Sequence, residues 1–128
     1  MADRSPDSFS ILSWNVRGLN SKFKRATLFQ YLKTRSPQLI LLQETHLMGS
    51  KILTLKKPWV QRAIHATYST YARGVSILIH KNFPCVIEEV RADPLGKYVI
   101  LVFTLWAQRY IIVNLYIPPP SHLPYCTR

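Results

Sequence analysis

The sequence predicts an α/β fold with one main helix and about seven strands. Near the N-terminus, a segment with helical spacing lies between two apolar runs of strand length, and after residue 58 the chain contains strand patterns only. Several strands are apolar at consecutive positions, which is typical of sheets covered on both faces. No repeat or change in composition divides the chain. We therefore expect one domain over residues 9–120, preceded by a flexible N-terminus (1–8) and followed by a tail (121–128).

The first three elements are expected to form a βαβ unit. Residues 9–15 are predicted to be a strand, residues 22–35 a helix, and residues 38–44 a buried second strand. Ser21 can cap the helix, and Pro37 can stop it. The apolar face of the helix is expected to consist of Phe23, Ala26, Phe29 and Leu32, with Leu28 alongside.

The rest of the chain is expected to alternate strands and turns. Residues 47–58 are taken as a connection, and the proline run 118–120 is expected to end the last strand. The remaining strands are predicted at residues 59–67, 74–81, 86–92, 97–106 and 109–117. With no helix between them, these strands should pair in antiparallel order.

The net charge indicates a polyanionic partner. Seventeen Lys and Arg against six Asp and Glu give +11, which favours nucleic acid, although a basic surface tuned for solubility accounts for it equally well. No membrane partner is expected, because no run reaches membrane-spanning length and the pattern lacks a basic amphipathic helix. Residues 1–8 lack the apolar segment of a signal peptide, so the nucleus or the cytoplasm is the expected location.

Glu44 is the first candidate for chemistry. It is the only carboxylate between Asp7 and Glu88, and it directly follows an apolar run. The carboxyl end of a buried strand is where open α/β sheets bind ligands, and a carboxylate there suits a hard divalent cation. A strand-end glutamate paired with a neighbouring cation is an equally good interpretation. Asn15 should emerge at the same edge, where its amide could complete a metal shell, orient Glu44 or simply form a turn.

Tyr116 is the second candidate. Period-2 alternation places it on one strand face with Tyr110 and Asn114. A phenol at a strand end can donate a hydrogen bond to a phosphate oxygen, although a tyrosine at the edge of a core is the more common role.

Four segments together resemble successive blocks of the endonucleases of LINE-type retrotransposons. These belong to the endonuclease/exonuclease/phosphatase superfamily and are related to apurinic/apyrimidinic endonucleases and DNase-like nucleases. The blocks are SWNVRGLNS (13–21), LLQETHL (41–47), RGVSILI (73–79) and NLYIPP (114–119). The resemblance implies the N-terminal half of a DNase-like four-layer α/β sandwich. It also implies a DNA endonuclease that depends on Mg²⁺, with Mn²⁺ as an alternative, and hydrolyses phosphodiester bonds.

The resemblance also implies roles for matched residues. Glu44 would be the Mg²⁺ ligand, Asn15 would support it and the scissile phosphate, and Tyr116 would hydrogen-bond that phosphate. His46 would act near the phosphate or serve only as a loop histidine. The residues expected to contact the DNA backbone are Arg17, Lys22, Lys24, Arg25 and Arg73. Three of these cations occupy the first helical turn, where the helix dipole disfavours positive charge, so their grouping suggests phosphate contact.

Two family blocks have no counterpart in the sequence. Family members continue with a Gly-Asp-x-Asn block and close with a Ser-Asp-His block, whereas the last acidic residue here is Asp93. We therefore expect an incomplete domain with little activity of its own. The alternative is an inactive, domesticated basic remnant that binds nucleic acid or a protein. One sheet and one helix would also leave an apolar sheet face open, so a homo-oligomer or another protein covering it is expected.

Overall fold

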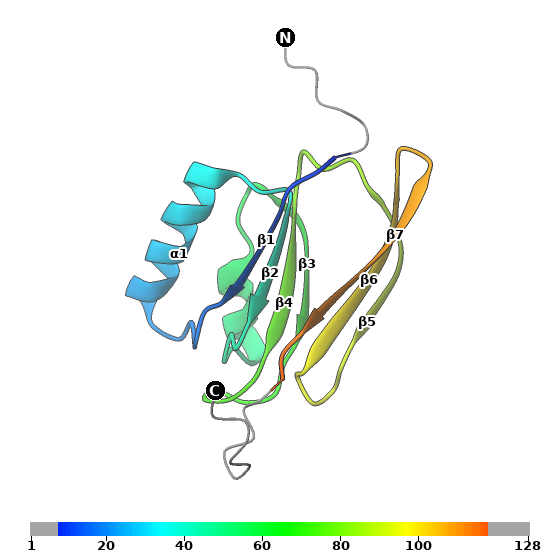
Figure 1. Ribbon diagram of the computed structural model, residues 1–128. Helices are drawn as coiled ribbons and strands as arrows, with labels where there is room; N and C mark the ends of the chain where they lie inside the picture. The colour runs from blue at the N-terminus through cyan, green and yellow to red at the C-terminus, as the bar shows by residue number, and fades with distance from the viewer. Residues whose placement is uncertain (1–7, 118–128) are drawn as a thin grey trace, which may run out of the picture.

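A computed structural model describes residues 8–117, which fold as an α/β domain of two sheets (Figure 1). The elements are β1 (Ile11–Asn15), α1 (Lys22–Arg35), β2 (Leu39–Gln43), η1 (Gly49–Leu55), β3 (Val60–Ala66), β4 (Val75–His80), β5 (Val86–Ala92), β6 (Tyr98–Leu105) and β7 (Gln108–Leu115). The predicted seven strands and main helix are confirmed. The predicted tail, the proline run and nearly all of the predicted N-terminal segment lie outside the described residues.

The strands form two sheets that pack face to face, so the expectation of a single sheet was wrong. The first sheet has the order β1-β2-β4-β3, and the second has the order β5-β6-β7. β1 and β2 are parallel, as the βαβ unit requires, and every other pair is antiparallel. After β4, the turn around the fully buried Phe83 carries the chain across to the second sheet. The later strands therefore form their own sheet and do not extend the first.

Two hydrophobic clusters lie on opposite faces of the first sheet. Between the sheets, Leu39 and Ile77 pack with Val99, Leu101 and Phe103 of β6. On the other face, residues of β2 and β4 pack against the helical elements; the fully or nearly fully buried members are Ile40, Leu42, Leu78, Leu28, Leu32 and Leu55. Figure 1 shows α1 and η1 on this side of the sheet. The consecutive apolar positions of β2 and β4 are thus buried on both faces, as predicted.

Helix α1 has the predicted bounds and caps, and its predicted face is confirmed for Leu28, Phe29 and Leu32 but not for Phe23 and Ala26. The Ser21 Oγ accepts a hydrogen bond from the backbone N–H of Lys24 at 3.2 Å, which confirms the cap. The buried side chains are Leu28 and Leu32, whereas Phe23 is 80% exposed and Ala26 is exposed as well. The half-buried residue in the first turns is instead Arg25, three residues before Leu28. A guanidinium that donates to backbone carbonyls is therefore the half-buried group in the first turns, where Phe23 and Ala26 were expected.

The stretch taken as a plain connection contains the 3₁₀ helix η1. Leu55 at its end is fully buried in the cluster beneath α1. Leu55 was missed because a 3₁₀ helix of seven residues is too short to show a clear period. Within residues 8–117, no helix has both the length and the apolar character needed to cross a membrane.

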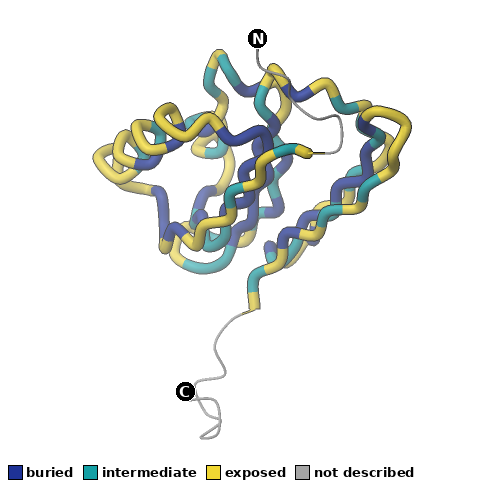
Figure 2. The backbone as a smooth tube through the Cα atoms, turned by 45° about the horizontal axis from the view of Figure 1, so that its top comes forward, coloured by how far each residue is buried: buried dark blue, intermediate teal, exposed yellow. Residues whose placement is uncertain are grey.

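The outer face of the second sheet is open and partly apolar. Ile111, Val113 and Leu115 of β7 are 65%, 52% and 51% exposed, while Asn114 is buried on the opposite face. This confirms the predicted alternation, and Figure 2 shows exposed positions along the outer sheet. The expectation of an open apolar face therefore applies to the second sheet alone. An oligomer or partner that covers it remains a prediction.

Candidate functional site

The predicted site lies where the carboxyl ends of β1 and β2 meet. Asn15 is the register partner of Gln43, so the loops after both strands leave the sheet side by side. Three backbone N–H groups of residues 16–19 donate to carbonyls of residues 43–45 at 2.6–2.9 Å. Two N–H groups of residues 45–46 donate to carbonyls of residues 73–74 at 3.0 Å. The sheet pairing thus continues into three loops and holds their side chains in fixed relative positions.

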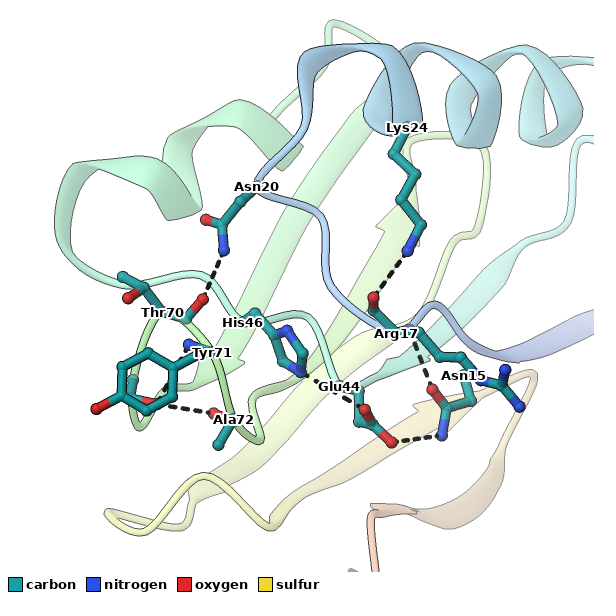
Figure 3. A network of polar contacts seen from close by, with 10 residues as sticks. Asn15, Arg17, Asn20, Lys24, Glu44, His46, Thr70, Tyr71 and Ala72 are labelled. Atoms are coloured by element: carbon teal, nitrogen blue, oxygen red, sulfur yellow. Dashed lines mark hydrogen bonds and ion pairs between the residues drawn. The ribbon is translucent and has the colours of Figure 1, made fainter.

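Asn15, Glu44 and His46 form a polar cluster in these loops (Figure 3). The Asn15 Nδ2 donates to the Glu44 Oε2 at 3.1 Å, and the His46 Nε2 lies 3.5 Å from the Glu44 Oε1. The Asn15 Oδ1 accepts from the backbone N–H of Arg17 at 3.1 Å, which fixes the orientation of the amide. The Glu44 side chain is 23% exposed. The carboxylate is therefore oriented by two neighbours and still open to solvent.

Tyr116 joins this cluster from the second sheet. Burial raises the pKa of its phenol, and the negative charge of Glu44 and a hydrogen bond to it raise the pKa further, while Arg73 lowers it. All four residues that the sequence suggested for catalysis are thus brought to one place. Tyr116 follows β7, so its position depends on how the second sheet is attached to the first.

Asn114 provides that attachment and was missed as a functional residue. Its Nδ2 donates to the carbonyls of Leu42 and Ser76 at 3.1 and 2.8 Å, and its Oδ1 accepts from the Gln43 Nε2 at 2.7 Å. Asn114 therefore ties β7 to β2 and β4, two residues before Tyr116. An amide on the inward face of an otherwise apolar strand was the available signal, since a buried amide requires hydrogen-bond partners.

A family model that matches most of the chain identifies the family. Residues 12–128 match the model of the Endonuclease/Exonuclease/phosphatase family. The chain belongs to this family. The predicted superfamily is thereby confirmed, and the match to the retrotransposon branch stays a prediction.

Solved structures of this family's fold support the assignment. An AP endonuclease from Leishmania major is 18% identical, with a TM-score of 0.70 over 94% of this chain and 44% of its own. TDP2 from D. rerio, complexed with a single-strand DNA product, is 23% identical, with a TM-score of 0.64 over 82% and 44%. A 3'-5' exonuclease from Neisseria meningitidis is 21% identical, with a TM-score of 0.59 over 86% and 42%. These likenesses show the fold, and the chain spans less than half the length of each protein.

Two glycines allow the loops of this Endonuclease/Exonuclease/phosphatase domain to approach closely. Gly18 has φ +91°, and a Cβ added there would lie 2.7 Å from the His46 Nδ1. Gly74 has φ +98°, and an added Cβ would collide with the Thr45 Oγ1 and lie 3.1 Å from the His46 backbone nitrogen. From the sequence alone, Gly18 is only a residue that favours turns. Its packing role depends on long-range contacts that no local pattern reports.

Most of the predicted DNA-contacting cations also make contacts within the protein. The Lys24 Nζ donates to the Arg17 carbonyl at 2.7 Å, and the Arg25 guanidinium donates to two carbonyls of the preceding loop at 2.8 and 2.9 Å. The Arg73 guanidinium lies 4.1 Å from the centre of a tyrosine ring and donates to a carbonyl of the β5–β6 turn at 3.1 Å. Arg17 and Lys22 are exposed. DNA contact by these residues stays a prediction, and Arg17 and Lys22 are the best placed for it.

The residues of the site fit a lightly coordinated Mg²⁺ or Mn²⁺. Within residues 8–117, no group of three or more His, Cys, Asp or Glu side chains could enclose a metal ion. Mg²⁺ commonly keeps several waters and uses one or two carboxylates together with substrate phosphates, so a site with Glu44 as its one carboxylate is compatible with this ion. The amide nitrogen of Asn15 faces the carboxylate, which matches an orienting role. A direct ligand role for Asn15 stays a prediction.

Proposed function

We propose that this chain carries the metal-binding part of a DNA nuclease of the retrotransposon type, which hydrolyses phosphodiester bonds. The convergence of Asn15, Glu44, His46 and Tyr116 at one edge of the first sheet carries the proposal. Family membership and the sequence blocks around these residues support the nuclease branch. An AP endonuclease and a DNA-bound TDP2 among the structural neighbours support DNA as the substrate class.

Each side chain has a distinct task in this proposal. A Mg²⁺ ion held by Glu44 would supply charge that neutralises the phosphate during hydrolysis. Asn15 holds Glu44 in position through the 3.1 Å hydrogen bond. The Tyr116 phenol is protonated at neutral pH, as an ordinary phenol is, so it can donate to a phosphate oxygen as negative charge develops there.

Metal binding at Glu44 is the most direct test of the proposed function. Titration of the whole chain with Mn²⁺, followed by electron paramagnetic resonance, should show weak binding that Mg²⁺ displaces. Glu44→Gln should abolish it, because the amide keeps the size of the side chain but removes the anionic oxygen. Glu89→Gln is the matched control, since Glu89 is an exposed carboxylate ion-paired with Arg91 on the second sheet. Unchanged affinity in Glu44→Gln, or equal losses in both variants, would eliminate this metal site.

DNA binding tests the substrate class. If five to eight phosphates are contacted, a plot of the logarithm of the binding constant against the logarithm of the salt concentration should have a slope of roughly −4 to −7. Arg17→Ala and Lys22→Ala should each reduce the slope by about 1, because each removes one phosphate contact. Arg109→Ala is the control, since this cation is ion-paired with Glu88 on the second sheet. A slope near zero in the unaltered chain would contradict phosphate contact.

A second candidate function is nucleic-acid binding without catalysis. The observation that favours it is that, within residues 8–117, Glu44 belongs to no group of three or more His, Cys, Asp or Glu side chains that could hold a metal ion. Phosphodiester hydrolysis also requires a positioned water molecule, and a second carboxylate commonly orients it. The two candidates differ in whether DNA is nicked in a Glu44-dependent reaction.

A further inference from the structure

A cavity of about 570 Å³ opens between the end of β1 and the first turns of α1. Its buried lining includes Leu19 and Leu28, which are 1% and 3% exposed. Trp14 and Phe23 also line it and are 36% and 80% exposed. The positive charge of Arg17 also lines it, and the other lining residues are Asn15, Val16, Lys24 and Thr27. The cavity therefore combines an apolar interior, two accessible aromatic rings and a positive charge.

This cavity adjoins the proposed metal site through Asn15. Asn15 is part of its lining, and the same side chain donates to the Glu44 carboxylate. Lys24 is also part of the lining, and its Nζ is held against the Arg17 carbonyl at 2.7 Å. A DNA strand whose phosphate lies at Glu44 would thus pass beside the cavity, with cations available for the adjacent phosphate.

Packing within the domain does not explain why the aromatic rings of Trp14 and Phe23 are exposed at this cavity. Phe23 lies on the first turn of α1 and packs into neither hydrophobic cluster. Trp14 is held from one side by an edge-on contact with Tyr31 at 5.0 Å between ring centres. Exposed aromatic side chains next to cations are the usual elements of sites that stack single-stranded bases, because every base presents an apolar π-face.

We propose that this cavity binds an unstacked nucleobase of the DNA strand whose phosphate lies at Glu44 and Asn15. The inference rests on the proposed function and specifies its substrate as a strand with at least one base outside the helical stack. The cavity volume lies within the range of small-molecule sites. The positive charge of Arg17 and Lys24 favours an anionic nucleotide over a neutral apolar peptide.

The test compares two single-stranded oligonucleotides of equal length, one of thymidines and one of abasic tetrahydrofuran units. Both carry the same phosphates, so backbone contacts alone cannot distinguish them. In fluorescence anisotropy with EDTA present, the thymidine strand should bind about tenfold more tightly, within the range for base–aromatic stacking. Phe23→Ser should bring this ratio close to one and leave abasic binding unchanged. Trp106→Asn, which alters an exposed aromatic on the β6–β7 turn, should keep the ratio of the unaltered chain.

The two proposals fail in different ways. Equal binding of both strands by the unaltered chain, or equal loss for both strands in Phe23→Ser, would overturn the nucleobase cavity. Phe23→Leu provides a second variant, because it keeps apolar bulk without an aromatic face and should lower the ratio partially. The ratio is measured without metal, so it does not depend on whether Glu44 binds a metal ion. A retained ratio together with Mn²⁺ binding that does not depend on Glu44 would refute the metal site and leave the cavity standing.

Discussion

Replacing Gly74 by alanine tests whether the three loops of the site are held as closely as the structure shows. The residue has φ +98°, a backbone conformation that side chains rarely adopt, and strain of this kind costs about 1–3 kcal/mol. The new Cβ would also collide with the Thr45 Oγ1, and Thr45 is only 2% exposed. Overpacking of a buried position adds about 1–3 kcal/mol. We therefore expect Gly74→Ala to lower the free energy of unfolding by roughly 2–6 kcal/mol.

Gly49→Ala is the matched control. Gly49 also has a positive φ, +58°, but no atom lies within 4 Å of an added Cβ. The left-handed backbone costs about 1–2 kcal/mol for alanine, and the loss of unfolded-state entropy returns about 0.4–1 kcal/mol. The net change should therefore stay near 1 kcal/mol. Gly49→Ala therefore has the strain of a positive φ without a steric contact like that with Thr45.

Urea unfolding followed by tryptophan fluorescence measures both variants. The midpoint should fall much further for Gly74→Ala than for Gly49→Ala, with the same dependence on denaturant. Equal destabilisation would mean that the loops around Thr45 and His46 are looser than the structure shows. The reasoning that fixes His46 beside Glu44 would then be refuted.

Three further predictions concern pH, catalysis and assembly. Burial lowers the pKa of His65 below 6.5, so the unfolded chain binds more protons below that pH. The stability due to this histidine is therefore complete above pH 6.5 and falls as the pH decreases toward the folded pKa. Urea midpoints measured at several pH values should show this decrease. His65→Gln should make the decrease smaller and leave the part due to His80, whose pKa is also lowered. The chain should nick supercoiled plasmid weakly or not at all with Mg²⁺, and strong nicking abolished by Glu44→Ala would contradict this. Light scattering at micromolar concentration should show an oligomer that Ile111→Lys weakens, and a stable monomer would refute an interface on the second sheet.

The sequence predicted the elements well because their signals are local. Ser21, the apolar period and Pro37 define α1, and its observed bounds match the prediction. The face of the same helix was predicted less well. Phe23 fits the apolar stripe by spacing, yet the helix is rotated so that Arg25 and Leu28 face inward. Rotation about the helix axis is determined by what the helix packs against, and a polar contact of Arg25 with the loop carbonyls outweighs a modest apolar preference.

The division into two sheets could not be predicted because strand patterns do not encode which strands pair. β4 and β6 have similar apolar sequences, but β4 is central in one sheet and β6 in the other. The deciding contacts are long-range, notably those of Asn114 with the carbonyls of Leu42 and Ser76. The candidate site was easier to predict, since parallel pairing of β1 and β2 alone brings Asn15 and Glu44 to one edge.

The packing of the two sheets also determines how close the residues of the site lie to one another. Tyr116 is carried by the second sheet and Glu44 by the first, so the distance between phenol and carboxylate depends on the Asn114 hydrogen bonds. Cutting those bonds, for example with Asn114→Leu, would remove a donor from the carbonyls of Leu42 and Ser76 and free the second sheet to shift. The pKa of Tyr116 would then lose the part of its rise that comes from Glu44. A lower pKa of the Tyr116 phenol in Asn114→Leu than in the unaltered chain, with both sheets still folded, would show that sheet packing positions the residues of the site.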